Sequence, residues 1–406
     1  GLSLIANTAP VAYGALGTPI ITLAKVHGYD VMEVTAMVGR QLPFFSLLVP
    51  FWLIWAFAGR KAMWEIWPAI LVTGASFAVM QFLVSNYIGP ELVDVIAAIV
   101  SMVCLVAFLK IWQPKKIWRS VSLKGHETDG GEGHEMAPPK RHARADVIRA
   151  WTPWVILTVF VFIWGLPDVK AFFNNIFAPK FPIEGLDKLI EKVPPVVKVP
   201  TKEGAVYTLN LLSATGTGIL LSAIVGGLVM KYNPLQLIKT FGSTLWLVRY
   251  SLLTIVLMLG LGSLTRYSGT DTTLGLAFAN TGWMYPFFGT LMGWLGVALT
   301  GSDTASNVLF GGMQKVAADQ LGLSPNLMGA ANSSGGVMGK MVDAQSIVVA
   351  STATRWFNHE GDILRYVFFH SIALACLVGV LVMLQAYVPP FTDMVIHSSA
   401  PVVSSH

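Results

Sequence analysis

Most of this chain consists of hydrophobic runs about twenty residues long, separated by shorter polar stretches. A helical run of that length spans the hydrocarbon core of a bilayer. The pattern therefore predicts an all-α polytopic membrane protein. The expected membrane-spanning helices lie near residues 41–59, 64–84, 91–110, 151–167, 209–230, 244–265, 284–300 and 363–388.

Two long polar segments divide these spans. Residues 111–150 are rich in Lys and Arg, whereas residues 168–208 carry Lys nearly balanced by Asp and Glu, with prolines that exclude one continuous helix. Counting the crossings puts the 111–150 loop on the same side as the basic connections at 60–61 and 231–239. Because Lys and Arg are enriched in cytoplasmic loops, we expect the 111–150 loop to be cytoplasmic and the 168–208 loop to be external.

Composition supports the membrane class and argues against others. Of the 406 residues, 54% are hydrophobic and 12% are charged, whereas a soluble protein has about 25% charged residues. The net charge of +5 would suit nucleic acid, but the Lys and Arg lie mostly in loops, as the positive-inside rule requires. We therefore expect a lipid bilayer and not nucleic acid as a partner. Cys104 and Cys376 lie inside apolar runs and have neither disulfide nor zinc spacing.

Two regions combine apolar sequence with helix-breaking residues. Prolines and glycines interrupt residues 1–26, which predicts a broken or re-entrant helix. Residues 301–352 are expected to form a hairpin and a second broken helix. The remaining expectations are transmembrane helices over 27–110, 151–167 and 209–300, and a last transmembrane helix with a tail over 353–406.

The region from 299 to 347 contains two polar, glycine-rich patches. Non-helical backbone at membrane depth persists only where protein buries it or water reaches it, and such polar patches suit a small polar solute. We interpret the patches as two helix tips of a transporter's binding site, although close helix packing requires the same small residues. The candidate binding residues are Gly301, Ser302, Thr304, Ser306 and Asn307 in the first patch and Asn332, Ser333, Ser334, Gly335 and Gly336 in the second.

A short internal match relates the two interrupted regions. Asn7-Thr8 aligns with Asn332-Ser333, and Gly14 then falls on Gly339. The match is short enough to arise by chance, but paired interrupted segments are typical of inverted-repeat secondary transporters with a site near the membrane midplane. Asn7 and Thr8 would then be the first repeat's contribution to the site. The first half lacks an upstream counterpart of 301–304, which implies a missing N-terminal portion.

Seven motifs follow one another in order along nearly the whole chain. They are Asn7-Thr8-Ala9-Pro10-Val11, Gly39-Arg40-Gln41-Leu42-Pro43, Asn86-Tyr87-Ile88-Gly89-Pro90-Glu91-Leu92, Trp112-Gln113-Pro114, Ser213-Ala214-Thr215-Gly216-Thr217, Leu299-Thr300-Gly301-Ser302-Asp303-Thr304 and Ala331-Asn332-Ser333-Ser334-Gly335-Gly336 with Gly339-Lys340. Together these motifs resemble the bacterial L-lactate permease family. The resemblance implies symport of L-lactate, and of D-lactate and glycolate, with protons across the bacterial inner membrane. It also implies about 130–150 residues upstream of this chain, as a two-repeat transporter would have. Helix N-termini at the two patches would suit the carboxylate of such a substrate.

Four ionisable residues are candidates for charge chemistry. Asp303 is costly at membrane depth, which indicates proton coupling, but it is also a good helix N-cap. Lys340 would offset the substrate's charge or form a structural ion pair with Asp303 or Asp343. Arg249, inside an expected span, would contact substrate or an acid. His370 would relay protons or be a core histidine bonded to a carbonyl.

Other functions remain as alternatives. A sodium-coupled carboxylate transporter of similar inverted-repeat build fits the same pattern, and a channel is also possible, although paired broken helices favour alternating access. An enzyme would need a nucleophile with a base, or a metal cluster. His359-Glu360 lacks the second histidine of a zinc-binding motif and Gly-x-Ser-x-Gly is absent. We therefore expect no enzymatic activity, no cofactor and no metal.

Overall fold

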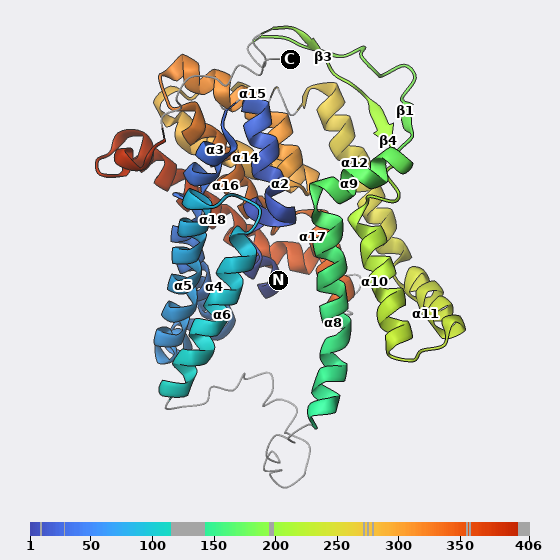
Figure 1. Cartoon of the computed structure of the whole chain (residues 1–406). Coiled ribbons are helices and arrows are strands. Elements are labelled where there is room, and N and C mark those ends of the chain that lie inside the picture. Colours follow the sequence, from blue (N-terminus) through green and yellow to red (C-terminus); the bar gives the residue numbers. More distant parts are fainter. Residues whose placement is uncertain are drawn as a thin grey trace. The chain divides into compact units, whose positions relative to one another are not determined.

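The computed structural model of this chain is predominantly helical (Figure 1). It describes residues 1–396 except 9, 28, 115–142, 195–198, 271–272, 274–275, 278–279, 355 and 357–358. Most of the loop expected over 111–150 therefore lies outside the described residues. The chain divides into two compact units, which are Gly1–Ile117, Lys192–Thr201 and Tyr250–His406 in unit 1 and Trp118–Glu191 and Lys202–Arg249 in unit 2.

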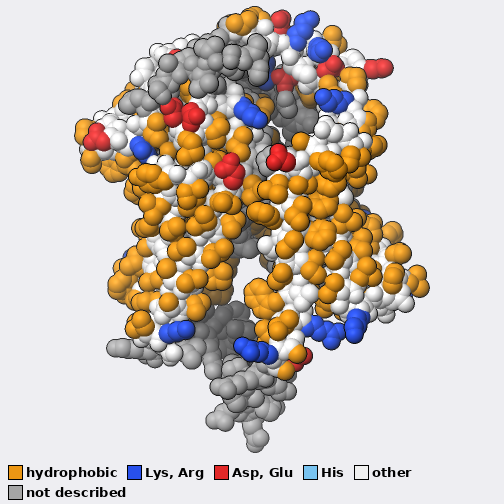
Figure 2. Space-filling model, in the orientation of Figure 1, with side chains coloured by type: hydrophobic (Ala, Val, Ile, Leu, Met, Phe, Trp, Pro, Cys, Tyr) orange, Lys and Arg blue, Asp and Glu red, His pale blue; other side chains and the backbone are white. Residues whose placement is uncertain are grey.

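Within the described residues, five helical stretches are long and apolar enough to cross a bilayer. They are Val31–Glu65, Trp67–Tyr87, Val93–Ile111, Arg144–Trp164 and Glu360–Tyr387. Figure 2 shows hydrophobic side chains over most of the visible flanks of the helices, as expected for surfaces that contact lipid. The protein is an all-α polytopic membrane protein.

The first part of unit 1 begins with short helices and continues with long ones. Its elements are α1 (Leu2–Ala6), η1 (Val11–Tyr13), α2 (Gly14–His27), α3 (Val31–Val38), α4 (Leu42–Glu65), α5 (Trp67–Tyr87) and α6 (Val93–Ile111). Residues Leu16 and Gly17 have positive φ inside α2, so the backbone departs from regular helical geometry there. The helices α4, α5 and α6 pack side by side (Figure 1). Ser46 Oγ donates to Gln81 Oε1 at 2.6 Å, which joins α4 to α5.

The second part of unit 1 holds the region of the polar patches. Its elements are α12 (Arg249–Ser268, in unit 1 from Tyr250), η2 (Gly282–Met284), α14 (Tyr285–Thr300), α15 (Asp303–Leu321), α16 (Pro325–Gly339), α17 (Ala344–Thr354), α18 (Glu360–Tyr387) and η3 (Phe391–Met394). Helix α14 packs against α15, α16 and α18, while α15 also packs against α2 and α16 against α3. Helix α16 is therefore surrounded by protein, and every residue from Asn326 to Gly339 is buried.

Unit 2 contains helices and short strands. Its elements are α8 (Arg144–Gly165), α9 (Pro167–Ile176), β1 (Lys180–Pro182), β4 (Val206–Thr208), α10 (Thr215–Val229) and α11 (Pro234–Leu247). Along the chain, the division between the units falls within the two-residue strands β2 (Glu191–Lys192) and β3 (Thr201–Lys202). The strand β1 pairs antiparallel with β4, and α8 packs against α10. The segment expected to be a loop over 168–208 is thus partly ordered into α9 and β-strands.

Two helix boundaries in this region differ from the hydropathy pattern. Helix α8 begins at Arg144, before the expected span, because polar residues can extend a helix beyond its apolar part. The span expected over 244–265 is divided, since α11 ends at Leu247 and α12 begins at Arg249. A hydropathy window averages over such a junction and does not detect it.

Candidate substrate and coupling site

Two helix junctions meet in unit 1. Gly301 joins α14 to α15 with φ of 70°, a conformation that favours glycine, and the Ser302 hydroxyl accepts from Ala305 N at 3.2 Å to cap α15. The junction between α16 and α17 supplies Lys340, whose Nζ donates to the Gly301 carbonyl at 2.6 Å. Lys340 also pairs with Asp343 at 3.1 Å. Of the two ion-pair partners expected for Lys340, the structure therefore shows Asp343. The bond from Lys340 to Gly301 connects the two junctions.

A buried polar network begins at Asp303, in the first turn of α15. Its Oδ2 accepts from Ser333 Oγ at 2.5 Å and from Asn307 Nδ2 at 3.4 Å. Asn332 Nδ2 in turn donates to Asn307 Oδ1 at 2.9 Å. Asp303 is 3% exposed and the other three side chains are fully buried. The structure therefore brings together the predicted residues of both patches, with α15 facing α16.

The network continues through two residues that the sequence analysis missed. Gln314 Nε2 donates to Asn332 Oδ1 at 3.2 Å and to the Gly289 carbonyl at 2.8 Å, and Tyr285 OH donates to Gln314 Oε1 at 2.7 Å. A signal for Gln314 existed, because residues 303, 307 and 314 share one face of a helix by their spacing of four and seven. No such spacing marks Tyr285, which lies on α14.

Six buried side-chain oxygens of the described residues have no hydrogen-bond partner. They are Asp303 Oδ1, Ser334 Oγ, Gln41 Oε1, Asn326 Oδ1, Asp94 Oδ1 at the start of α6, and Asp343 Oδ2, which is ion-paired with Lys340. Nearly all buried polar atoms in proteins are paired, so such an atom requires an explanation such as strain, a catalytic role, or a bound water or ion. Asp303 has one oxygen engaged and one free to carry a proton. Asp94 was not singled out in the sequence, because an acidic residue in the first turn of a helix is ordinary.

The expected helix tip at 332–336 is wrong. Helix α16 runs without interruption from Pro325 to Gly339, and its N-terminus is capped by Ser324 with proline following. The glycines instead allow α14 and α16 to approach closely, since a Cβ on Gly335 would lie 2.2 Å from the Thr290 carbonyl oxygen. A Cβ on Gly336 would lie 2.5 Å from Asp303 Oδ1. Close packing is therefore the structural role of Gly335 and Gly336.

The remaining binding candidates differ in burial and in hydrogen bonding. Ser306 Oγ donates to the Gly293 carbonyl at 3.2 Å, which joins α15 to α14, and Thr304 is half-buried. Thr8 is buried with its hydroxyl donating to the Ile5 carbonyl at 3.0 Å. Asn7, at the end of α1, is exposed.

Arg249 and His370 have other hydrogen-bond partners among the described residues. Arg249 belongs to unit 2, where it donates to the Trp246 carbonyl at 2.6 Å and lies over the Trp246 ring. His370 lies on α18, and its Nδ1 accepts from Trp52 Nε1 at 3.1 Å. This indole partner replaces the backbone carbonyl that a core histidine was expected to have.

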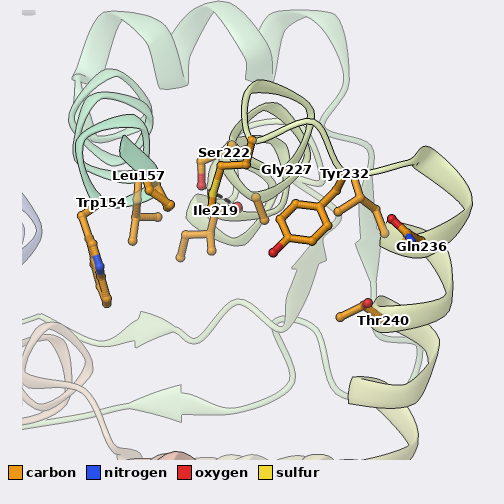
Figure 3. A pocket seen from close by; sticks show the side chains of 13 residues that line it. Trp154, Leu157, Ile219, Ser222, Gly227, Tyr232, Gln236 and Thr240 are labelled. Atoms are coloured by element: carbon orange, nitrogen blue, oxygen red, sulfur yellow. Dashed lines mark hydrogen bonds between the residues drawn. The ribbon is translucent and has the colours of Figure 1, made fainter. Parts of the chain in front are cut away.

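Unit 2 contains a cavity of about 580 Å³ between α8, α10 and α11. Trp154, Leu157 and Ile219 give it an apolar wall, while Tyr232, Gln236 and Thr240 lie on the other side (Figure 3). Its lining includes no charged residue, so the cavity lacks a counterion for a carboxylate. Elsewhere in the described part of the chain, no group of three His, Cys, Asp or Glu residues could hold a metal ion.

Comparison with known proteins gives consistent matches along the chain. The family model for L-lactate permease matches residues 1–389. The L-lactate permease of Salmonella typhimurium is 44% identical over 96% of this chain and 70% of its own length. The glycolate permease GlcA of Escherichia coli is 45% identical over 98% of this chain and 72% of its length. The L-lactate permease of Bacillus subtilis is 41% identical over 96% of this chain and 71% of its own length.

No solved structure matches the chain. The family match nevertheless extends over both units and includes the two helix junctions and the buried network. Its members are permeases, which are transporters and not enzymes. With this match and its membrane-spanning helices, the chain belongs to the L-lactate permease family.

Proposed function

We propose that this protein carries L-lactate, and also D-lactate and glycolate, together with protons across the bacterial inner membrane. The relatives named L-lactate permease and glycolate permease support the substrate class. The observation that carries proton coupling is the buried carboxyl of Asp303, with one oxygen bonded to Ser333 and the other unpartnered among the described residues. An ionisable group enclosed at membrane depth is a default indication of an ion or proton pathway.

In this proposal the substrate binds where α15 begins. The α15 N-terminus supplies backbone N–H groups and a positive dipole end for the carboxylate, with the hydroxyls of Ser302 and Thr304 beside it. Lys340, already bonded to Gly301 at this junction, supplies a positive charge. The amides of Asn307 and Asn332 then suit the substrate's hydroxyl group, because an amide both donates and accepts.

Binding requires a rearrangement, since the network residues are buried and bonded to one another. We propose that α15 separates from α16 when the substrate enters, and that a proton then binds Oδ1 of Asp303, which is unpartnered among the described residues. Protonation removes a charge that would repel the substrate's carboxylate. Substrate and proton would therefore bind together, as symport requires.

The N-terminal broken helix is proposed as the matching half of an inverted repeat. Asn307 Nδ2 donates to the Pro19 carbonyl of α2 at 3.2 Å, and η1 packs against α16. The broken N-terminal region thus contacts α15 and α16 of the second half, as expected at the repeat interface of such transporters. Thr8, buried beside this region, would be the first half's contribution.

The decisive experiment compares accumulation with exchange for Asp303→Asn. The chain is expressed in cells without their own lactate carriers, and uptake of labelled L-lactate is measured at acidic and neutral external pH. The asparagine still accepts from Ser333, so we expect lactate–lactate exchange to persist while proton-driven accumulation falls by about tenfold or more. The control is Asp362→Asn, since Asp362 is exposed and pairs only locally with His359.

Accumulation by Asp303→Asn at the wild-type level would overturn the coupling role. Replacing sodium with choline tests the alternative of sodium coupling. Uptake that persists in choline and collapses with a protonophore supports protons, whereas uptake lost in choline supports the sodium-coupled carboxylate transporter.

A further inference from the structure

His27, the last residue of α2, fills a groove between α15 and α16. Its side chain is 1% exposed. The ring Nε2 lies 2.8 Å from the Gly311 carbonyl oxygen of α15. On the other side, a Cβ added to Gly329 of α16 would lie 2.3 Å from His27 Cε1. The imidazole therefore occupies space that only a glycine on α16 leaves open.

The hydrogen bonding of this ring defines its tautomer. A carbonyl can only accept, so Nε2 carries the hydrogen that is donated to Gly311. The other nitrogen, Nδ1, is then an acceptor, and it is buried with no hydrogen-bond partner among the described residues. A proton added to Nδ1 would create an N–H group without an acceptor in a dry site, which is costly. The closed packing thus accommodates neutral imidazole only.

The charged groups that act on this histidine lie on α15, and the other helices around it differ in the charges they carry. On α15, Lys315 and Asp319 act electrostatically on the ring with opposite signs, and Lys315 Nζ also donates to the His27 carbonyl. Helix α16 carries no ionisable side chain, and α2 itself carries Lys25 near its end. Tyr29 packs edge-on against the ring at 5.8 Å. Around the α16 N-terminus, Glu33 of α3 accepts from Asn326 at 3.2 Å.

The groove is adjacent to the buried polar network. Gly311 lies one helical turn after Asn307, and Gly329 lies one turn before Ser333. A movement that separates α2 from α15 and α16 at His27 would therefore be transmitted within one turn to the residues that surround Asp303.

We propose that His27 Nδ1 is a proton-binding site whose occupation opens the contact between α2 and the α15–α16 pair. The proton comes from water and forms an N–H bond at Nδ1, while Nε2–H is retained and no covalent bond breaks. The imidazolium gains solvent when the helices separate, and its deprotonation restores the closed packing. The role of this opening in transport rests on the proposed function, but the proton site itself does not.

The test is hydrogen exchange of α15 and α16 peptides in the full chain, in nanodiscs without substrate, at about pH 5.5 and about pH 7.5, on either side of an ordinary histidine pKa. After correction for intrinsic rates, we expect about threefold or faster exchange at the acidic pH in the wild type, because opening controls exchange. His27→Gln keeps a donor for Gly311 but cannot bind the proton, so the pH difference should vanish. The matched control, His359→Gln, removes an exposed histidine and should keep the difference.

Persistence of the pH difference in His27→Gln would overturn the proposal. If that variant does not fold, exchange of the His27 Cε1 hydrogen in the wild type reports its protonation directly. Protonation that follows the same pH curve as the opening of α15 and α16 supports the proposal, and independent curves overturn it. A further variant, Gly329→Ala, should displace the ring and increase exchange at both pH values, leaving little dependence on pH.

Uptake measurements separate this inference from the proposed function. Wild-type uptake that is independent of protons, with the exchange difference intact, overturns proton symport and leaves the histidine site standing. Proton-coupled uptake with no exchange difference overturns the histidine site and leaves symport standing.

Discussion

Helices α16 and α10 are both rich in small and hydroxyl residues, yet only α16 takes part in a polar network. In α10 the buried positions Gly218, Ser222 and Gly226 repeat every four residues, and the helix packs against α8. Ser222 Oγ donates to the Ile219 carbonyl of its own helix. In α16, by contrast, Ser333 donates across to Asp303 of α15. Small residues bring two helices together in either case, but a site requires polar partners on the neighbouring helix.

The difference follows from the number of neighbours. Helix α16 packs against α14, α15, α18 and α3, so its polar side chains cannot reach lipid or water and must find partners within the protein. Helix α10 leaves much of its surface exposed. Variants matched between the two regions therefore test whether this contrast controls stability and transport.

The largest effect is expected for Gly335→Ala in α16. The added Cβ would lie 2.2 Å from a backbone oxygen of α14, and overpacking of this kind costs about 1–3 kcal/mol or more. The matched variant in α10 is Gly216→Ala, where nothing lies within 4 Å of the added atom. Thermal unfolding in detergent should show a lowered midpoint for Gly335→Ala and an unchanged midpoint for Gly216→Ala. Equal midpoints would contradict the close approach of α14 and α16.

A smaller loss is expected for Asn332→Ala. This change leaves Asn307 Oδ1 without its donor and Gln314 Nε2 with one acceptor fewer, at a cost of about 2 kcal/mol for unsatisfied buried groups. Ser222→Ala is the comparison in α10 and should change the free energy of unfolding by about 0.5 kcal/mol or less. Denaturant unfolding measures the free energy of unfolding of both variants. Equal values for Asn332→Ala and Ser222→Ala would contradict the proposed difference between α16 and α10.

Lys340→Gln should reduce lactate uptake by about tenfold, because it leaves Asp343 as a buried, unpaired carboxylate. The double variant with Asp343→Asn then distinguishes two roles of Lys340. If the double variant recovers uptake, the role of Lys340 is a structural ion pair with Asp343. If it folds normally but does not take up lactate, the role of Lys340 is to bind the substrate. Arg249→Gln, in unit 2, is the matched removal of a cation and should leave uptake within about twofold, because this arginine interacts with a carbonyl in the last turn of α11.

The smallest effect is expected for Tyr285→Phe. Loss of the hydroxyl removes its bond to Gln314 Oε1, which costs about 1 kcal/mol. Tyr232→Phe alters the wall of the unit 2 cavity, where the tyrosine is 52% exposed, and should have no measurable effect. Unfolding curves of the two variants that coincide would show that the network ends before Tyr285.

Much of this protein was predictable from its sequence. Runs of apolar residues identified the membrane class, since the length of a spanning helix follows from bilayer thickness. The motifs around Asp303 and Asn332 identified the family. The apolar runs and the motifs are local features, because each involves residues that are close together in the sequence.

The partners of these residues were not predictable in the same way. The sequence suggested a helix tip at Asn332, but tertiary packing continues α16 through it, since surrounding helices compensate for the low helix propensity of its glycines and serines. The unpartnered nitrogen of His27 depends on Gly311 and Gly329, about three hundred residues away in the chain. The sequence by itself determined the membrane class, the family and the chemical groups that are present. Only the tertiary structure decided which groups are buried together and which are left unpaired, because burial and hydrogen bonding depend on neighbours in space and not along the chain.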